Sequence, residues 1–459
     1  MSTEARPERA SARLPARTIA LYSVGSVGTG GYATLPGLVL TYFLTDNLGV
    51  AALAAGLIVT AAKIWDVVID PLIGAASDRQ LARTGSRRGF MITGAATLPL
   101  FFALTFAVPP SWGPAAGAIG VLLAFLATAT AFSLFQVPYV ALPAELTSGY
   151  DERTRLLGWR VVVLTAAILL FGAGGPELRR AGSDQVVGYL IMGVIAGLVI
   201  GIGMYVASKT ADAAAASAAR TTAAAEHPAG FREQYASGFR ALRRSAPFRA
   251  LLGTFLLQAL ATGTMLAGAQ YVATWVLRSE AAVTLVFLAL VGPALLATPG
   301  WTAVARRTGK ERAFRIASVL FTLAAASITA AVWAPGAWIY LSVAVAGVAY
   351  AGLQSLPMAM LPDVISHDER ANGPGQAGTF TGVWTAGETV GFALGATFVS
   401  LTLAATGYVS TVAGATTQQP DAAITGIVLS FSILPAALMA ASLSTLSRYR
   451  LRRGDIDAP

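Results

Sequence analysis

The sequence has no cysteine and only two histidines in 459 residues. The absence of cysteine excludes disulfide frameworks and thiolate metal sites. Two hydrolase motifs are also missing, the Gly-x-Ser-x-Gly elbow and the His-Glu-x-x-His pair. The histidines, His227 and His367, fall in polar connections, where solvated side chains are expected. We therefore expect a protein that is not an enzyme and that needs no metal or other cofactor.

Charge is scarce as well. Only 12% of the residues are charged, whereas a soluble protein carries about 25%, and 55% are hydrophobic. The net charge of +9 is spread over short connections, which indicates membrane topology and not a nucleic-acid partner. The first 17 residues are basic and contain no apolar core, so we predict no signal peptide.

Apolar segments long enough to cross a bilayer as helices recur along the whole chain. We predict an all-α polytopic membrane protein with twelve transmembrane helices. The predicted spans are 18–46, 50–77, 90–109, 113–143, 155–175, 185–208, 247–277, 281–304, 313–334, 337–361, 376–406 and 422–446.

Lysine and arginine concentrate in the tail before the first span, in the even-numbered connections and in the final tail. The odd-numbered connections contain only Arg179, Arg180 and Arg278. Because cytoplasmic loops carry the excess of basic residues, both termini are predicted to be cytoplasmic. We expect a multi-pass protein of the cell (inner or plasma) membrane.

The chain divides into two halves at one long connection. We predict a tail at 1–17, a six-helix bundle at 18–208, a linker at 209–246, a second six-helix bundle at 247–447 and a tail at 448–459. The end of the linker, 231–246, is expected to be either an amphipathic helix on the inner leaflet or a flexible basic segment.

The halves repeat each other. The segment from Gly74 to Arg88 has a counterpart near Gly300, Arg306 and Arg307, and Pro138-Tyr-Val-Ala-Leu-Pro143 is echoed by Pro357-Met-Ala-Met-Leu-Pro362. Parallel six-helix repeats around a midplane site are a transporter architecture. The repeat predicts two pseudo-symmetric bundles that rock against each other.

The second span contains three charged residues inside an apolar run. Lys63, Asp66 and Asp70 are spaced i, i+3 and i+7, so they share one helical face. An ionisable group at membrane depth costs at least about 2.5 kcal/mol and usually faces a bundle interior or a water-filled cavity. Pro71 favours a kink beside them. A channel is disfavoured, because the repeat places Gly292 where the first half has Asp66.

These residues resemble a known family. Gly74-x-x-x-Asp78-Arg79 with Arg87-Arg88 is similar to the signature of the major facilitator superfamily. Lys63-Ile-Trp-Asp66-x-x-x-Asp70-Pro71, Val137-Pro138-Tyr139 and Gly382-Val-Trp384-Thr resemble the glycoside–pentoside–hexuronide:cation symporters, the melibiose-permease group.

The resemblance implies roles for several residues. It places the coupling cation at Asp66 and Asp70 and a sugar-binding arginine at Arg160, whereas acidic positions of the melibiose permease fall here on Gly30 and Gln136. Gln136 could still lend a neutral oxygen to sodium, and Lys63 opposes cation binding. The coupling ion is therefore either a proton or sodium.

Further residues are candidates for substrate contact or gating. Arg160 either binds substrate or forms an ion pair with Asp66 or Glu388, and Glu388 is expected to line the path. Aromatic residues either stack on a sugar or pack between helices. They are Trp65, Tyr139, Trp159 and Trp384. A gating latch is predicted from a cytoplasmic set of charged residues and one glycine, namely Gly74, Asp78, Arg79, Arg87, Arg88 and Arg306.

We therefore predict a secondary active transporter that moves a small organic solute, a sugar or glycoside, by cation-coupled alternating-access symport. Its expected partners are the substrate, the coupling cation and the bilayer, and it is expected to be a monomer. The second hypothesis for the function is a proton-driven exporter of drugs or secondary metabolites, because the sugar-site substitutions leave a roomier, less polar cavity. The third hypothesis is a lysolipid carrier.

Overall fold

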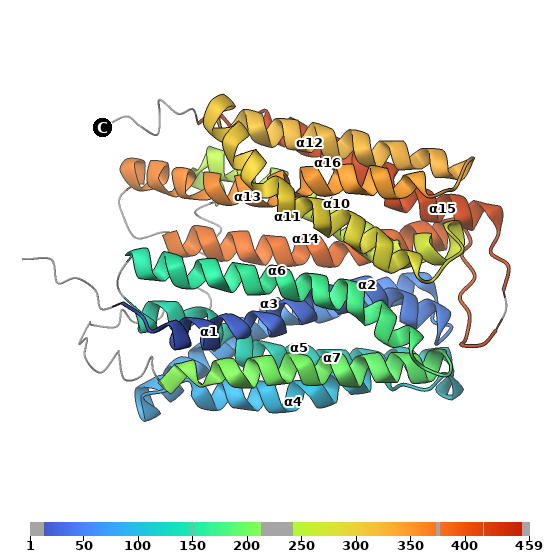
Figure 1. The fold of residues 1–459 in the computed structure, drawn as a ribbon, viewed down its shortest axis with the longest axis horizontal. Helices are drawn as coiled ribbons and strands as arrows, with labels where there is room; N and C mark the ends of the chain where they lie inside the picture. The colour runs from blue at the N-terminus through green and yellow to red at the C-terminus, as the bar shows by residue number, and fades with distance from the viewer. Residues whose placement is uncertain (1–12, 148–149, 213–241, 373–376, 416, 452–459) are drawn as a thin grey trace, which may run out of the picture.

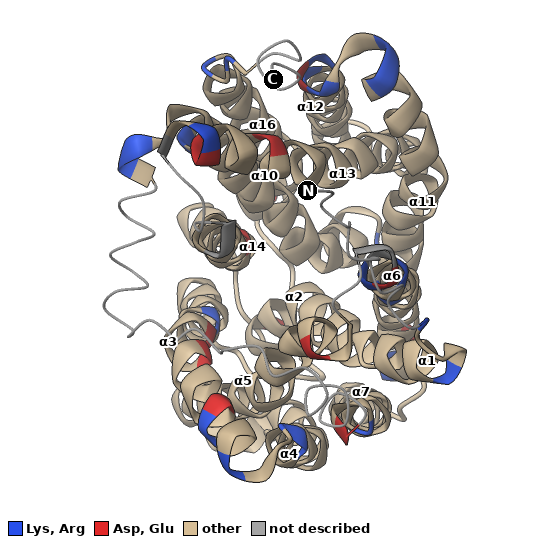
Figure 2. Cartoon of the chain, turned by 90° about the vertical axis from the view of Figure 1, so that its left-hand side faces the viewer, with Lys and Arg blue, Asp and Glu red and all other residues tan. Residues whose placement is uncertain are grey.

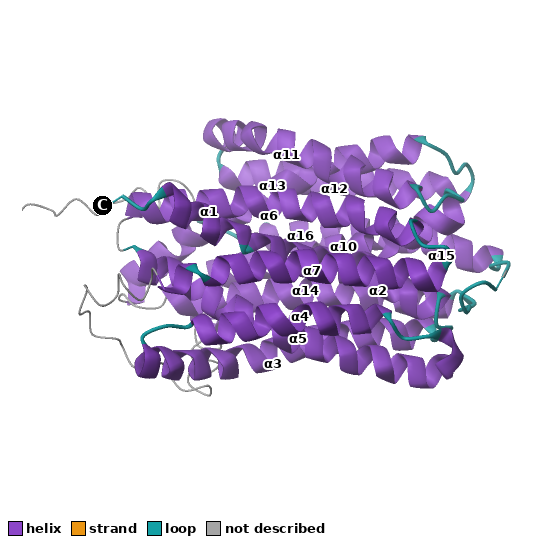
Figure 3. Ribbon diagram, turned by 60° about the horizontal axis from the view of Figure 1, so that its bottom comes forward, coloured by secondary structure: helices purple, strands orange, loops and turns teal. Residues whose placement is uncertain are grey.

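The structure is a computed structural model, and it describes residues 13–147, 150–212, 242–372, 377–415 and 417–451. The described chain is a set of long, roughly parallel helices joined by short connections (Figures 1 and 3). The helices of the first half are α1 (Ala16–Val24), α2 (Ser26–Asp46), α3 (Ala52–Thr84), α4 (Arg88–Phe106), η1 (Pro110–Trp112), α5 (Gly113–Leu146), α6 (Tyr150–Arg180) and α7 (Gln185–Ser208).

The second half repeats this arrangement. Its elements are α10 (Ala246–Tyr271), the π-helix η2 (Val272–Val276), α11 (Ala282–Thr308), α12 (Lys310–Ser327), η3 (Ile328–Val332), α13 (Trp338–Asn372), α14 (Ala377–Ala405), α15 (Asp421–Phe431) and α16 (Ile433–Leu446). Most of the predicted tails and of the predicted linker lies outside the described ranges, and so does most of the predicted amphipathic segment at 231–246.

Eleven helical segments of the described chain are long and apolar enough to cross a membrane, and they coincide with the second to twelfth predicted spans. The first predicted span is the pair α1 and α2, which meet at Gly25. A Cβ at Gly25 would lie 2.6 Å from the Tyr139 ring, so only glycine allows the helices this close. The twelfth span is divided at Ser432 into α15 and α16, just before Pro435, whose missing N–H weakens the helix there.

The helices pack mainly within their own half. In the first half α4 packs on α5 and α7, and α2 packs on α6; in the second half α13 packs on α11 and α12, and α10 packs on α14 and α16. Three pairs of helices carry the principal contact between halves: α3 with α14, α2 with α10, and α6 with α11. Figure 1 shows the two bundles one above the other.

The two ends of the molecule differ in charge. We call the end at which α1 begins and α16 ends the termini end, and the opposite one the far end (Figure 1). Figure 2 looks onto the termini end and shows basic residues around its helix ends. Arg179 and Arg180, in the last turn of α6, and Arg278, in the connection after η2, lie at the far end. The structure thus gathers on one end the basic residues that the sequence assigns to one side of the membrane.

The two halves are bonded to each other toward the far end. Thr60 of α3 donates to the carbonyl of Ala393 at 3.0 Å, and Thr397 of α14 donates to the carbonyl of Gly56 at 3.2 Å. A short antiparallel bridge pairs Leu48 with Val412. The hydrogen bonds and ion pairs observed between described residues of the two halves lie in this part of the molecule. This conformation is therefore closed at the far end.

Candidate functional site

The charged residues of α3 lie midway along a helix that contacts both halves. α3 packs on α5 within its own bundle and on α14 of the other. Lys63, Asp66 and Asp70 occupy the stretch between the two ends, and Pro71 continues the helix directly after them. The side chain of Asp66 is buried, and those of Lys63 and Asp70 are partly buried. The predicted charged stripe is therefore present inside the helical assembly.

Lys63 and Asp66 form an ion pair inside the helical assembly. Lys63 Nζ lies 3.1 Å from Asp66 Oδ2. The same oxygen accepts a hydrogen bond of 3.4 Å from the hydroxyl of Tyr32 on α2. The Lys63 ammonium also lies 4.0 Å from the centre of the Tyr32 ring, within the range of a cation–π contact. One carboxylate oxygen of Asp66 thus has two donors, and one tyrosine holds both partners of the ion pair.

The carboxylates keep two buried oxygens without a hydrogen-bond partner, Asp66 Oδ1 and Asp70 Oδ1. Ser133 of α5 is a polar neighbour of Asp70, as are Asp66 and Lys63 of α3 itself. Buried polar atoms in native proteins are nearly always paired, so unpaired acceptors on neighbouring turns indicate a missing donor or cation. A proton or a small hard cation meets that need, because both bind carboxylate oxygen.

Gln136 has a partner outside the carboxylate group. Its Oε1 accepts a hydrogen bond of 2.8 Å from the hydroxyl of Thr29 on α2. In this conformation the amide oxygen therefore binds α2 to α5, and its role as a cation ligand stays a prediction.

Arg160 of α6 lies against Tyr139 of α5. Its guanidinium carbon is 5.4 Å from the centre of the Tyr139 ring, and its Nε is buried without a hydrogen-bond partner. Within the described residues Arg160 forms no ion pair with Asp66 or Glu388, contrary to one of the two expected arrangements. A guanidinium with an unused buried N–H is equipped to bind an oxygen-rich or anionic solute.

The four candidate aromatic residues divide into two groups. Tyr139 and Trp384 are buried: Tyr139 stacks on Tyr22 at 4.6 Å, and Trp384 stacks on Phe255 at 4.2 Å. Both are therefore part of the packing inside their own bundle in this conformation. Trp65 and Trp159 are exposed. Substrate contact by these four side chains stays a prediction.

Glu388 of α14 is partly buried, as expected for a residue that lines a path through the second bundle. Nearby on α13, the Gln354 amide donates to the Tyr350 hydroxyl at 2.6 Å. The structure shows no partner for Glu388 within the described residues, so its role also stays a prediction.

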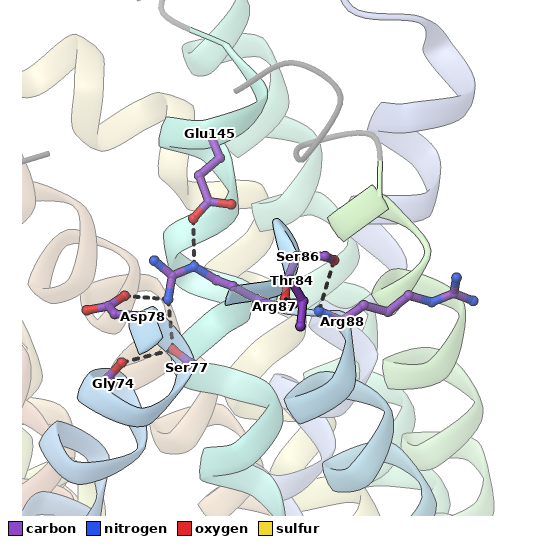
Figure 4. A network of polar contacts seen from close by, with 8 residues as sticks. All are labelled: Gly74, Ser77, Asp78, Thr84, Ser86, Arg87, Arg88 and Glu145. Atoms are coloured by element: carbon purple, nitrogen blue, oxygen red, sulfur yellow. Dashed lines mark hydrogen bonds and ion pairs between the residues drawn. The ribbon is translucent and has the colours of Figure 1, made fainter. Parts of the chain in front are cut away.

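A polar network at the termini end contains several of the predicted gating residues (Figure 4). Arg87, at the start of α4, lies 2.5 Å from Asp78 of α3 and 2.6 Å from Glu145 at the end of α5. It also donates to the Ser77 hydroxyl at 2.8 Å, and Ser77 donates to the carbonyl of Gly74 at 3.0 Å. One guanidinium therefore joins the ends of three helices.

The electrostatic balance of this network keeps the arginine charged. Burial alone lowers the pKa of Arg87, but its bonds and its attraction to Glu145 and Asp78 outweigh burial and raise the pKa above its usual value. The network therefore persists at any pH at which the two carboxylates are ionised.

The other predicted gating residues lie outside this network. Arg88 pairs with Asp212 at 2.6 Å, whereas the side chains of Arg79 and Arg306 are exposed. The second half has an ion pair in a similar place. Lys310, at the start of α12, lies 2.6 Å from Asp363 near the end of α13. The repeat is therefore visible in the bonds as well as in the sequence.

Three residues of the site were not among the predicted ones. Tyr32 and Ser133 reach the carboxylates from α2 and α5, and Glu145 completes the Arg87 network. A lone tyrosine or serine in an apolar span gives no local signal. Glu145 was detectable as an acidic residue two positions after Pro143, the end of the repeated segment.

The fold and the site define a membrane transporter built from two six-helix bundles with a charged site inside the first bundle. A sequence model of the MFS/sugar transport protein family matches residues 21–453. The chain belongs to this family. Because the family and the relatives that match are transporters, the prediction that the protein is not an enzyme is confirmed.

Two relatives illustrate the similarity. An uncharacterized symporter of Synechocystis sp. is 26% identical, with 94% of this chain and 93% of the relative covered. A glucuronide carrier protein homolog of Escherichia coli K12 is 25% identical, with 92% of this chain and 90% of the relative covered.

Solved structures show the same fold. A bacterial homolog of the human lysosomal transporter Spinster superposes with a TM-score of 0.65 at 12% identity, covering 95% of this chain and 98% of that one. A bacterial homologue of the iron transporter ferroportin also has a TM-score of 0.65, at 13% identity and with the same coverage of 95% and 98%. The predicted fold class is therefore confirmed.

Proposed function

We propose that this protein is a symporter that carries a sugar or glycoside together with a cation, and that Asp66 and Asp70 bind that cation. The observation that supports the cation site most is the pair of unpaired buried oxygens, Asp66 Oδ1 and Asp70 Oδ1. They lie one helical turn apart in a membrane helix that touches both bundles. Export of drugs and lysolipid transport are not favoured, because the similar proteins include symporters and a glucuronide carrier homolog.

Lys63 is the internal competitor of the transported cation in this proposal. In the present conformation its ammonium neutralises one oxygen of Asp66 at 3.1 Å. A proton or sodium ion that binds the free oxygens reduces the negative charge and weakens the hold of the carboxylate on Lys63. The side chain of Lys63 can then move away from Asp66 while its ammonium stays in contact with the ring of Tyr32. Cation binding thus changes the contacts at α3, which also packs on α14 of the other half.

The substrate binds, in this proposal, beside Arg160. The unpaired Nε–H and planar guanidinium of Arg160 can bind a sugar that has a carboxylate or paired hydroxyl groups. The similarity to a glucuronide carrier homolog makes an acidic sugar the first compound to test. Coupling requires that cation and sugar favour the same conformations, so that each raises the affinity for the other.

We also propose that the termini end faces the cytoplasm and that one chain is the working unit. The basic residues around the termini end favour that orientation under the positive-inside rule. The present conformation, with its bonds between halves at the far end, is then closed to the outside. Each chain contains both bundles, so no second copy is needed to form the site.

Binding of Na⁺ can be tested without knowing the sugar. The purified protein is unfolded by heat in detergent with Na⁺ or with choline as the only monovalent cation. A ligand at about 100 times its dissociation constant stabilises a protein by about 2.7 kcal/mol. We expect the stabilisation to be lost in the double variant Asp66→Asn/Asp70→Asn and kept in Asp421→Asn, an exposed aspartate at the start of α15.

A proton site gives a different result in the same samples. Na⁺ then has no effect on stability, and addition of methyl-β-D-glucuronide causes proton uptake that a pH-sensitive dye records. That uptake is also expected to disappear in the double variant. A Na⁺ response or a proton uptake that survives loss of both carboxylates would contradict the proposed site.

A further inference from the structure

A buried carboxylate joins the two halves at the far end, a long way from the charged residues of α3. Asp46 is the last residue of α2 and is 6% exposed. Its Oδ1 accepts a hydrogen bond of 2.6 Å from the hydroxyl of Tyr408, which belongs to the second half. Its Oδ2 accepts one of 2.6 Å from the hydroxyl of Thr45. Hydrogen bonds to a carboxylate are stronger than those between neutral groups.

The polar contacts continue from this carboxylate into the second half. The hydroxyl of Thr45 lies 2.7 Å from that of Tyr271 at the end of α10. The indole N–H of Trp275, in the π-helix η2, donates to the Tyr408 hydroxyl at 2.9 Å. Three aromatic residues of the second half are therefore held, directly or through one hydroxyl, by two consecutive residues of α2.

A second chain of contacts runs from the same residues to the α6–α11 side of the interface. Tyr42 of α2 packs edge-on against Tyr271, with ring centres 5.1 Å apart. The Arg179 guanidinium lies 6.0 Å from the Tyr42 ring and pairs at 3.1 Å with Glu280 of the second half. The side chain of Arg179 is 5% exposed. The polar and aromatic contacts thus cross the whole far-end interface.

We infer that Asp46 and Tyr408 form the latch of the far-end gate. Their bond exists only while the halves meet there, so it adds to the stability of the conformation that is closed at the far end. A permanent interface would be at least as stable with apolar side chains in place of a buried carboxylate. A carboxylate becomes hydrated when the halves separate, so it suits a contact that breaks and reforms in every transport cycle.

This inference concerns the conformations and is independent of which cation or sugar is carried. It also gives a role to residues that neither the charged stripe of α3 nor the Arg87 network uses. The two networks lie at opposite ends of the molecule. The Arg87 network joins helices within one half, whereas the Asp46–Tyr408 latch joins the two halves.

Distance measurement between spin labels tests the latch. The chain has no cysteine, so labels attach only at Ser111→Cys and Ala334→Cys, two exposed far-end positions on different halves. The full-length protein is studied in lipid nanodiscs by electron–electron double resonance. We expect Tyr408→Phe to raise the ratio of far-end-open to closed molecules about tenfold, which corresponds to about 1.4 kcal/mol.

The matched control is Tyr340→Phe. It also removes a tyrosine hydroxyl at the far end of the molecule, near the start of α13, but that hydroxyl is not part of the latch. It should leave the distance distribution unchanged. In an Asp46→Ala background, Tyr408→Phe should have no further effect, because the two groups act through one bond. A distribution for Tyr408→Phe that matches the unsubstituted protein, or an effect that persists without Asp46, would overturn the inference.

Discussion

At the residue scale, the two aspartates of α3 have unequal surroundings. Asp66 is paired with Lys63 and Tyr32, whereas Asp70 forms no ion pair among the described residues. Removal of one partner of a buried ion pair leaves the other charge without compensation. Removal of a charge that has no counterion relieves repulsion instead. The same chemical change at the two positions should therefore have different consequences.

We predict that Asp66→Asn lowers the free energy of unfolding by about 1–3 kcal/mol, because Lys63 loses its counterion. Asp70→Asn should leave stability unchanged or raise it, because a carboxylate next to Asp66 is removed. Thermal unfolding in detergent, followed by tryptophan fluorescence without transported cation, measures both. Equal losses for the two variants would show that Lys63 does not depend on Asp66.

The sequence made the charged stripe predictable but not its partners. Lys63, Asp66 and Asp70 stand out because charges are rare inside an apolar span. Tyr32 and Ser133 come from other helices and are ordinary residues there. Tyr139 and Trp384 belong to segments with family resemblance, yet their side chains are buried in helix packing. A motif indicates which positions matter, whereas the orientation of each side chain depends on the neighbouring helices.

At the element scale, the termini ends of α3, α4 and α5 are held by one side chain. Arg87 bonds to Asp78 and Glu145 and is largely buried, while Arg79 lies one residue after Asp78 and is exposed. The repeated motif predicts both arginines equally. Only the packing of α3 on α5 decides which of them lies between two carboxylates.

We predict that Arg87→Ala destabilises the protein by about 1–3 kcal/mol, because Glu145 is left partly buried without a cation. Arg79→Ala should change stability by no more than about 0.5 kcal/mol, as is usual for exposed positions. The comparison uses thermal unfolding of the two variants side by side. If the two substitutions cost the same, the arginines serve only as basic surface charges.

At the scale of the whole molecule, hydropathy and the repeat were enough to predict the two-bundle fold. Eleven spans coincide with the predicted ones, and the glycine-rich first span is divided at Gly25. The ion pairs of Arg87 and of Lys310 occupy similar places in the two halves, as the sequence repeat predicts. The far-end latch was not predictable, because Asp46 and Tyr408 are 362 residues apart and follow no shared pattern.

The charge of the two ends favours the proposed membrane orientation. If the far end faces outward as proposed, we predict that a membrane-impermeant maleimide labels Ser111→Cys in intact cells. Ala82→Cys, exposed near the termini end of α3, should react only after permeabilisation. The absence of native cysteine removes background labelling. The reverse pattern would place the basic end outside and contradict the proposed topology.

In the proposed function, the carboxylates of α3 couple transport to a cation gradient. Proteoliposomes with an imposed Na⁺ or pH gradient are supplied with radiolabelled methyl-β-D-glucuronide, and both accumulation and counterflow are measured. We predict that Asp66→Asn/Asp70→Asn abolishes gradient-driven accumulation and retains counterflow, whereas Asp421→Asn behaves like the unsubstituted protein. Undiminished accumulation by the double variant would contradict it.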